Sequence, residues 1–181
     1  MVAVSSLCVF CGSLNGSNQN YHKLTQKVGK MAAHNDMRII YGGANIGLMK
    51  ILADSCLKNG GNVMGIIPKA LYEKELAHKQ LHTLKVTESM QQRKALMFKE
   101  AEAFLILPGG FGTLDELFEI ATYRHIGLHN KPIYLLNCEN YWKPLILLLN
   151  HVKLSGFFDN DIADLITVVD GVDELFSLLK H

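Results

Sequence analysis

Short apolar runs alternate with segments of helical periodicity along almost the whole chain. In chain order the runs read SSLCVFC, RIIY, NVMGII, LHTLKV, AFLIL, PIYLLN and LITVV. Between the first two runs, apolar residues recur at the spacing of an amphipathic helix, at Tyr21, Leu24, Val28 and Met31. This alternation is typical of βαβ units, in which helices connect parallel strands. The sequence therefore predicts an α/β fold built on a parallel sheet.

The length and charge of the chain limit its organisation and its partners. Its 181 residues suit one domain, residues 1–181, and no linker, repeat or low-complexity stretch divides them. The formal net charge is +1, so no overall field recruits nucleic acid or an anionic membrane. The first residues lack the basic segment of a signal peptide, and the first apolar run is too short to span a membrane. We expect a cytoplasmic protein with neither nucleic acid nor membrane as a partner.

Two patterns could in principle hold a metal or a redox centre. Cys8 and Cys11 form a C-x-x-C pair within a predicted strand, where side chains three residues apart point to opposite faces. We interpret them as ordinary buried thiols. His125 and His129 lie four residues apart, but no third ligand or H-E-x-x-H pattern accompanies them. We expect structural roles for these histidines, and neither a metal nor a cofactor.

Three loops that follow predicted strands are rich in glycine: CGSLNGSN, YGGANIG and PGGFG. In open α/β sheets ligands bind beyond the carboxyl ends of the strands, so a site is expected at these loops. Gly42, Ala44 and Gly47 approximate the dinucleotide fingerprint, but alanine replaces the middle glycine and no acidic residue ends the next strand. No loop has the G-K-[ST] ending of a P-loop. The fingerprint is therefore a weak match.

The third glycine loop lies within LPGGFGTLDELFE and has a clearer physical meaning. Gly109, Gly110 and Gly112 can adopt positive φ and expose their amides. A helix expected to begin near Thr113 would point the positive end of its dipole at the same place. Such a turn is a site for one phosphate group. A plain strand-to-helix turn uses the same residues, and this motif alone does not separate the two interpretations.

The acidic residues of that helix also have two interpretations. Thr113 and Glu116 fit a capping box, in which the carboxylate accepts a hydrogen bond from the amide of the cap residue, and Asp115 suits the first turn. Taken alone, Glu116 favours this structural interpretation. Glu116 and Glu119, however, lie one turn apart on one face of the helix. Two neighbouring carboxylates either repel each other or serve a cationic or reacting group.

The preceding predicted helix, SMQQRKALMFKE, supplies Arg93 and Lys94. Most such charges lie on a solvated helix face. The strand AFLIL that follows this helix leads directly into the third glycine loop, so the helix could pack near that loop. An arginine fork placed there would suit a phosphate or a carboxylate.

Together these segments resemble the LONELY GUY family, the cytokinin riboside 5'-monophosphate phosphoribohydrolases, long mislabelled as lysine decarboxylases. PGGFGTLDE is similar to the P-G-G-x-G-T-x-x-E motif of the family, and MQQRKALM stands in place of its M-H-x-R-K. The segments CVFCGS, YGGANIGLM and GLHNKPIYLLN extend the resemblance over nearly the whole chain. This combination in this order is highly specific.

The resemblance implies a Rossmann-like, doubly wound sheet with helices on both faces, and a homodimer with its sites near the interface. It also implies hydrolysis of a nucleoside monophosphate to free base and ribose 5-phosphate. By position, Arg93 and Glu116 match the catalytic pair of the family. The substrate-binding positions implied in the same way are Gly12, Ser13, Gly42, Gly43, Met90, Lys94, Pro108, Gly109, Gly110, Gly112, Thr113 and Glu119. Gln91, Ala44 and Tyr123 depart from the family pattern and leave the preferred base open.

We therefore predict a metal-free N-glycosidase that acts on AMP-like nucleotides, including N6-prenylated ones. Glu116 would stabilise the positive charge that builds on the sugar and orient a water, while Arg93 holds Glu116 and anchors the substrate. Two other functions stay open. A non-catalytic nucleotide or molybdenum-cofactor carrier on the same scaffold would not need both Arg93 and Glu116. A nucleic-acid-linked role predicts a basic groove, which a net charge of +1 does not supply.

Overall fold

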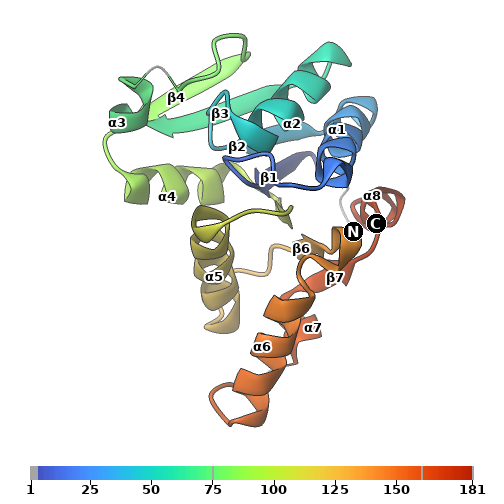
Figure 1. Cartoon of the computed structure of the whole chain (residues 1–181). Coiled ribbons are helices and arrows are strands. Elements are labelled where there is room, and N and C mark those ends of the chain that lie inside the picture. The colour runs from blue at the N-terminus through green and yellow to red at the C-terminus, as the bar shows by residue number, and fades with distance from the viewer. Residues whose placement is uncertain (1–3, 75, 160, 181) are drawn as a thin grey trace.

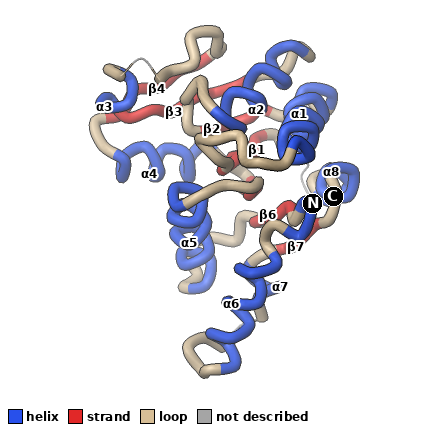
Figure 2. The backbone as a smooth tube through the Cα atoms, in the orientation of Figure 1, coloured by secondary structure: helices blue, strands red, loops and turns tan. Residues whose placement is uncertain are grey.

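The computed structural model describes residues 4–74, 76–159 and 161–180. They form a seven-stranded parallel sheet with the order β4-β3-β2-β1-β5-β6-β7. The strands are β1 (Ser6–Phe10), β2 (Arg38–Tyr41), β3 (Val63–Pro68), β4 (Thr83–Thr87), β5 (Ala103–Ile106), β6 (Ile133–Leu136) and β7 (Thr167–Val169). Figure 2 shows these strands in red among the blue helices that enclose them. The predicted α/β fold on a parallel sheet is confirmed.

Helices lie between successive strands, as the alternating pattern predicts, and one more follows the last strand. They are α1 (Gln19–His34), α2 (Gly47–Lys58), α3 (Lys69–Tyr72), α4 (Met90–Glu100), α5 (Phe111–His125), α6 (Lys143–Leu154), α7 (Ile162–Leu165) and α8 (Val172–Leu178), with a 3-10 turn η1 (Cys138–Asn140) before α6. No helix in the described part of the chain is long and apolar enough to cross a membrane.

The apolar side chains of the strands divide between two cores, one on each face of the sheet. Leu7 and Val9 of β1 pack with residues of α1, α2 and α8, whereas Cys8 and Phe10 pack with residues of α4 and α5. The two groups of helices are separated by the strands in Figure 1. A parallel strand covered on both faces reads as a continuous apolar run, which explains why these segments do not alternate with polar residues. Helices on both faces are therefore confirmed.

The C-x-x-C pair is divided between the two cores. Cys8 belongs to the core under α4 and α5, and Cys11 to the core under α1, α2 and α8. Both are free thiols, and burial raises the pKa of each of them. The interpretation as ordinary buried thiols is confirmed.

The strand order creates a switch point beside β1. The chain moves outward from β1 to β4 and then returns to place β5 on the other side of β1. The loops after β1 and β5 meet there, and the amide of Gly12 donates to the carbonyl oxygen of Pro108 at 3.0 Å. The loop after β2 joins them, because Gly47 has φ 55° and a Cβ on it would lie 2.3 Å from the carbonyl carbon of Ser13. The three glycine loops therefore meet at the carboxyl ends of the strands.

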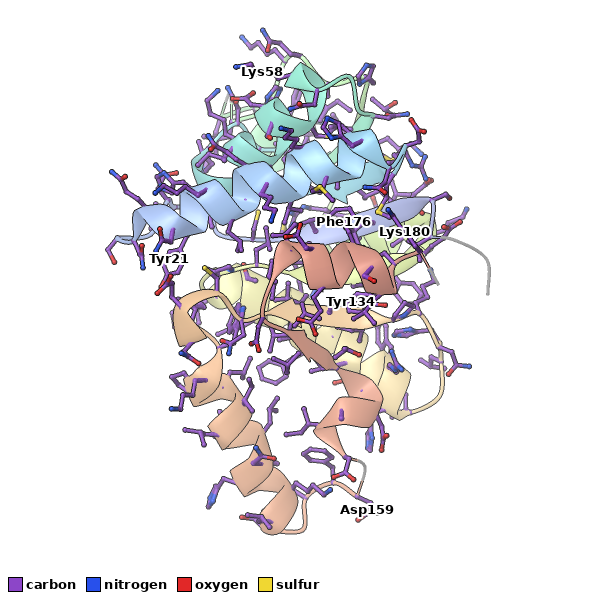
Figure 3. All side chains as sticks on the ribbon, turned by 90° about the vertical axis from the view of Figure 1, so that its right-hand side faces the viewer. Tyr21, Lys58, Tyr134, Asp159, Phe176 and Lys180 are labelled. Atoms are coloured by element: carbon purple, nitrogen blue, oxygen red, sulfur yellow. The ribbon has the colours of Figure 1, made fainter. Side chains whose placement is uncertain are left out.

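The helix α6 extends away from the sheet, as Figures 1 and 3 both show. Of its residues Lys143–Leu154, only Leu145 is buried. Leu147 is 59% exposed, Leu148 53% and Leu154 87%. This helix therefore presents an apolar surface to solvent.

Candidate active site

A crevice of about 260 Å³ opens at the switch point between β1 and β5. Its walls come from the loops after these strands, from α1 and α2, and from the segment after β6: Gly12, Ser13, Leu14, Gly16, Tyr21, Leu48, Pro108, Gly109, Gly110 and Tyr141. Half of these residues are predicted substrate-binding positions, namely Gly12, Ser13, Pro108, Gly109 and Gly110. The crevice lies where a doubly wound sheet is expected to hold a ligand.

The third glycine loop enters its helix earlier than the sequence predicts. The helix α5 begins at Phe111 with Gly110 as its N-cap, and no side chain caps it. Thr113 therefore lies inside the first turn, where it is 3% exposed. The carboxylate of Glu116 accepts a hydrogen bond from Arg93 instead of from a cap amide. The capping box of Thr113 and Glu116 is wrong, because Gly110 already turns the chain into the helix two residues before Thr113.

The glycines of this loop provide close packing and access. None of Gly109, Gly110 and Gly112 has a positive φ, so that part of the prediction is wrong. A Cβ on Gly109 would lie 2.1 Å from Oγ1 of Thr113, which means that only glycine lets the loop lie against the helix. A Cβ on Gly110 or Gly112 would instead meet nothing within 4 Å. The loop is therefore packed on one side and open on the other.

The first turn of α5 leaves backbone amides available to a ligand. Amides at a helix start have no acceptor within the helix. In the described part of the chain, the amides of Gly110, Phe111, Gly112 and Thr113 donate to no other group either. Phe111 is 95% exposed, so its side chain does not cover them. Free amides at the positive end of the helix dipole suit an anion the size of a phosphate.

Arg93 of α4 and Glu116 of α5 form a buried ion pair. Nη1 of Arg93 donates to Oε1 of Glu116 at 3.1 Å, and its Nε donates to the carbonyl oxygen of Ile66 at 3.0 Å. Both charged side chains are 9% exposed. A Cβ on Gly42 would lie 2.1 Å from Nη2 of Arg93, so the missing side chain at Gly42 makes room for the guanidinium. Arg93 therefore does not lie on a solvated face, the alternative that the sequence leaves open.

Burial makes Glu116 a carboxyl group that titrates near neutral pH. Loss of hydration raises its pKa to about 7, and the attraction of Arg93 offsets this only in part. The neighbouring carboxylate of Asp115 raises it further. A group that gains and loses a proton near the working pH is suited to general acid or base catalysis.

Lys94 and Glu119 form a second, more exposed cluster on the same two helices. Nζ of Lys94 pairs with Oδ2 of Asp115 at 3.0 Å and also with Oε2 of Glu119. Although partial burial lowers it, these two carboxylates raise the pKa of Lys94 overall. The hydroxyl of Tyr123 donates to Oε1 of Glu119 at 3.3 Å. Glu116 and Glu119 are thus each held by a separate cation, which removes the repulsion expected of the two carboxylates.

The loop after β2 is paired with the segment around Ala77. Gly43 has φ 74°, and its carbonyl oxygen accepts from the amide of His78 at 2.9 Å. Ala44 is 4% exposed and pairs with Ala77 in an isolated bridge. The amide of Asn45 donates to the carbonyl oxygen of Leu76 at 2.7 Å. Two glycines of this loop make room for neighbouring groups, Gly42 for the guanidinium of Arg93 and Gly47 for the backbone of Ser13.

Met90 and the two histidines do not line the crevice. Met90 is the first residue of α4, is 43% exposed and does not line the crevice. His129 is buried, with Nε2 2.9 Å from the carbonyl oxygen of Ile120 and Nδ1 accepting from the amide of Lys131 at 3.1 Å. The ring of His125 packs edge-on against Phe158. The expected structural roles of the two histidines are confirmed.

Two aromatic residues of the crevice were missed by the sequence analysis. The sequence patterns indicate Tyr21 only as an apolar position of a helix, and they give Tyr141 no role. In the structure their rings lie 5.5 Å apart in the wall of the crevice, and the hydroxyl of Tyr141 donates to the carbonyl oxygen of Gly109 at 2.6 Å. A tyrosine in the segment that follows a predicted strand is the only sequence signal that could have indicated Tyr141.

Comparison with known proteins gives consistent matches over most of the chain. Residues 49–179 match the family model described as possible lysine decarboxylase. A protein of Rhodococcoides fascians named cytokinin riboside 5'-monophosphate phosphoribohydrolase is 44% identical over 153 residues, which are 84% of this chain and 77% of that protein. A protein of Arabidopsis thaliana with the same name is 35% identical over 96% of this chain and 82% of its own length.

Solved structures share the architecture at much lower identity. The molybdenum cofactor binding protein from Rippkaea orientalis superposes with a TM-score of 0.73. The matched region covers 97% of this chain and 94% of that protein, and the two sequences are 18% identical. At this identity the likeness concerns the fold alone.

Proposed function

We propose that this chain, which belongs to the LONELY GUY family of cytokinin riboside 5'-monophosphate phosphoribohydrolases, hydrolyses the bond between base and ribose in nucleoside 5'-monophosphates. The substrates are AMP and N6-substituted adenosine monophosphates, including the cytokinin ribotides. The products are the free base and ribose 5-phosphate. The observation that carries this proposal is the buried pair of Arg93 and Glu116, beside a helix start with free amides.

Substrate binding begins at the third glycine loop, which is called the glycine turn below. The free amides of residues 110–113 hold the 5'-phosphate, with the dipole of α5 adding to the attraction. Thr113 and Glu116 lie three residues apart on one face of the same helix, so a phosphate at the helix start places the ribose toward Glu116. The predicted substrate-binding roles of Met90, Lys94 and Glu119 belong to the same proposal.

Chemistry then takes place at the sugar. The bond between C1' of the ribose and the base nitrogen breaks, and positive charge builds on the sugar ring. The ionised carboxylate of Glu116 stabilises that charge and accepts a proton from the attacking water, whose oxygen bonds to C1'. The nitrogen of the departing base takes up a proton, and Glu116 releases the proton that it gained, so that the net reaction consumes one water. Arg93 keeps Glu116 in place through the 3.1 Å hydrogen bond and is itself held by Ile66.

The alternative of a non-catalytic carrier has one specific observation in its favour. The structure resembles that of a molybdenum cofactor binding protein. A carrier needs a turn for phosphate but has no need of a carboxyl group whose pKa is raised to about 7 by burial against an arginine. Burying such a group costs free energy, and a catalytic role explains why the chain bears that cost.

We further propose that the protein is a cytoplasmic homodimer whose two sites lie near the interface. The apolar surface of α6 supports an association, because Leu147, Leu148 and Leu154 are all more than half exposed. Sedimentation at micromolar concentration is expected to give twice the chain mass of 20.2 kDa. A fully active monomer would contradict the dimer.

The direct test is to incubate the purified protein with AMP, N6-isopentenyl-AMP and a set of other nucleoside monophosphates, and to detect released base by chromatography. Release of adenine or of the N6-substituted base, together with ribose 5-phosphate, is expected. If AMP binds and no nucleotide releases a base, the carrier alternative replaces the enzyme.

A further inference from the structure

The segment between β6 and α6 holds two consecutive residues in a strained backbone conformation. Glu139 has φ 52° and Asn140 has φ 56°. Residues other than glycine adopt positive φ at a cost in free energy, and they keep this conformation only where the surrounding structure imposes it. Such residues are concentrated at functional positions. Tyr141 directly follows these two residues in the chain.

Tyr141 is held firmly in the wall of the crevice. Its ring packs edge-on against Tyr21 at 5.5 Å and against Trp142 at 4.7 Å between ring centroids. Nδ2 of Asn20 donates to Oε1 of Glu139 at 2.9 Å, which ties the strained turn to α1. In Figure 3, Tyr21 lies at the end of α1 that is next to the start of the α6 segment. The hydroxyl of Tyr141 therefore has little freedom to leave the glycine turn.

Three consecutive carbonyl groups of the glycine turn are each held by one donor. The oxygen of Pro108 accepts from the amide of Gly12 at 3.0 Å, and the oxygen of Gly110 accepts from the amide of Leu114 at 3.0 Å. The oxygen of Gly109, between them, accepts from the hydroxyl of Tyr141 at 2.6 Å. Among the residues that the structure describes, a side chain thus holds only the middle one of these three carbonyls.

The bond to Gly109 fixes the direction of the next amide. Across a planar trans peptide, the carbonyl of Gly109 and the N–H of Gly110 point in opposite directions. Anchoring the oxygen on Tyr141 therefore turns the N–H of Gly110 away from Tyr141. This N–H donates to no group in the described part of the chain. Glycines on both sides of the peptide leave it free to tilt if the anchor is lost.

We propose that Tyr141 is a positioning residue for phosphate binding, which aims the amide of Gly110 at the 5'-phosphate by holding the carbonyl of Gly109. This inference rests on the proposed function only in taking the turn as the phosphate site. Tyr141 itself contacts neither the phosphate nor the reacting bond. The strained turn at Glu139 and Asn140 places the hydroxyl of Tyr141 against the carbonyl oxygen of Gly109.

The test compares Tyr141→Phe with Tyr134→Phe, which makes the same change at a buried tyrosine of β6 that does not line the crevice. Affinities for AMP, ribose 5-phosphate and adenosine are measured by calorimetry, and kcat and KM for AMP by base release. Tyr141→Phe is expected to weaken AMP and ribose 5-phosphate about tenfold, to leave adenosine unchanged and to raise KM more than it lowers kcat. Tyr134→Phe is expected to match the parent protein in all of these.

Equal AMP affinity in Tyr141→Phe and the parent protein overturns the inference, as does an equal loss for adenosine and AMP. A parent protein that releases no base, yet binds ribose 5-phosphate tenfold more tightly than Tyr141→Phe, refutes the proposed activity and leaves the inference standing. If Tyr141→Phe does not fold, amide NMR of the parent protein decides. Ribose 5-phosphate must then shift the Gly110 resonance, and a stationary Gly110 resonance overturns the proposal.

Discussion

Replacing Glu116 with glutamine separates chemistry from structure at the centre of the site. Glu116→Gln keeps the size of the side chain and an oxygen that can accept from Nη1 of Arg93 at 3.1 Å. It removes the charge and the ability to take a proton from water. Because burial raises the pKa of Glu116 to about 7, the parent protein has this carboxyl group about half ionised at neutral pH.

The loss of the base should lower kcat by roughly 10²–10⁴. AMP affinity should persist or increase, because the phosphate is held by backbone amides and a negative charge near it is gone. In the parent protein the ionised fraction rises from about one tenth at pH 6 to about nine tenths at pH 8, from the pKa of about 7. Parent kcat/KM should therefore rise about tenfold across this range, because kcat/KM reports the pKa of the free enzyme. The residual activity of Glu116→Gln should not follow this profile.

The carboxyl group of Glu116 also makes stability depend on pH, but stability should fall with rising pH where activity increases. Its pKa is about 7 in the folded protein, above the ordinary value of 4.5. Its contribution to stability is therefore complete below about pH 4.5 and is lost as the pH rises through about 7. Over this window it lowers the free energy of unfolding of the parent protein by up to about 3 kcal/mol. Glu116→Gln should lack this decrease.

The measurements are base release at several pH values, AMP calorimetry and urea unfolding at pH 5 and pH 8. Asp115→Asn is the matched control, because it removes the neighbouring carboxylate, whose side chain is 58% exposed and pairs with Lys94. It should change kcat less than about threefold. A Glu116→Gln protein with the kcat and pH profile of the parent would falsify the catalytic assignment and leave Glu116 as a structural partner of Arg93.

Three further predictions concern Arg93, Gly42 and the phosphate site. Arg93→Ala should weaken AMP binding and kcat together and lower stability by about 3 kcal/mol, since it leaves a buried carboxyl group unpaired; calorimetry and unfolding check this. Gly42→Ala should lower kcat/KM by about 10²-fold, because its Cβ would meet Nη2 of Arg93 at 2.1 Å, whereas Gly171→Ala, with open space around it, should not. Adenosine should be cleaved at least about 10²-fold less efficiently than AMP, because binding of the phosphate positions the reacting bond; equal kcat/KM for the two would contradict the phosphate site.

Local residue patterns were sufficient to predict the elements of the fold. The apolar runs and the helical spacing of Tyr21, Leu24, Val28 and Met31 predict the strands and α1, because the period of a pattern depends only on neighbours along the chain. The opposite faces of Cys8 and Cys11 follow from the strand period in the same way. The resemblance of PGGFGTLDE to the family motif also identifies Glu116 as a candidate catalytic residue, although its spacing from Thr113 favours a capping box.

What the sequence could not decide depends on which distant segments meet. The hydrogen bonds of Arg93 to Ile66 and Glu116 join residues 27 and 23 positions apart, and the pKa of Glu116 near 7 follows from their burial together. The helix starts at Phe111 because Gly110 turns the chain there, and a glycine has no side chain to signal a cap. Gly42 and Gly109 are required by atoms of Arg93 and Thr113, and Tyr141 reaches Gly109 from 32 residues away. Residue type and spacing set the local conformation of a chain, but distances, burial and charge pairing arise only when the sheet brings its loops together.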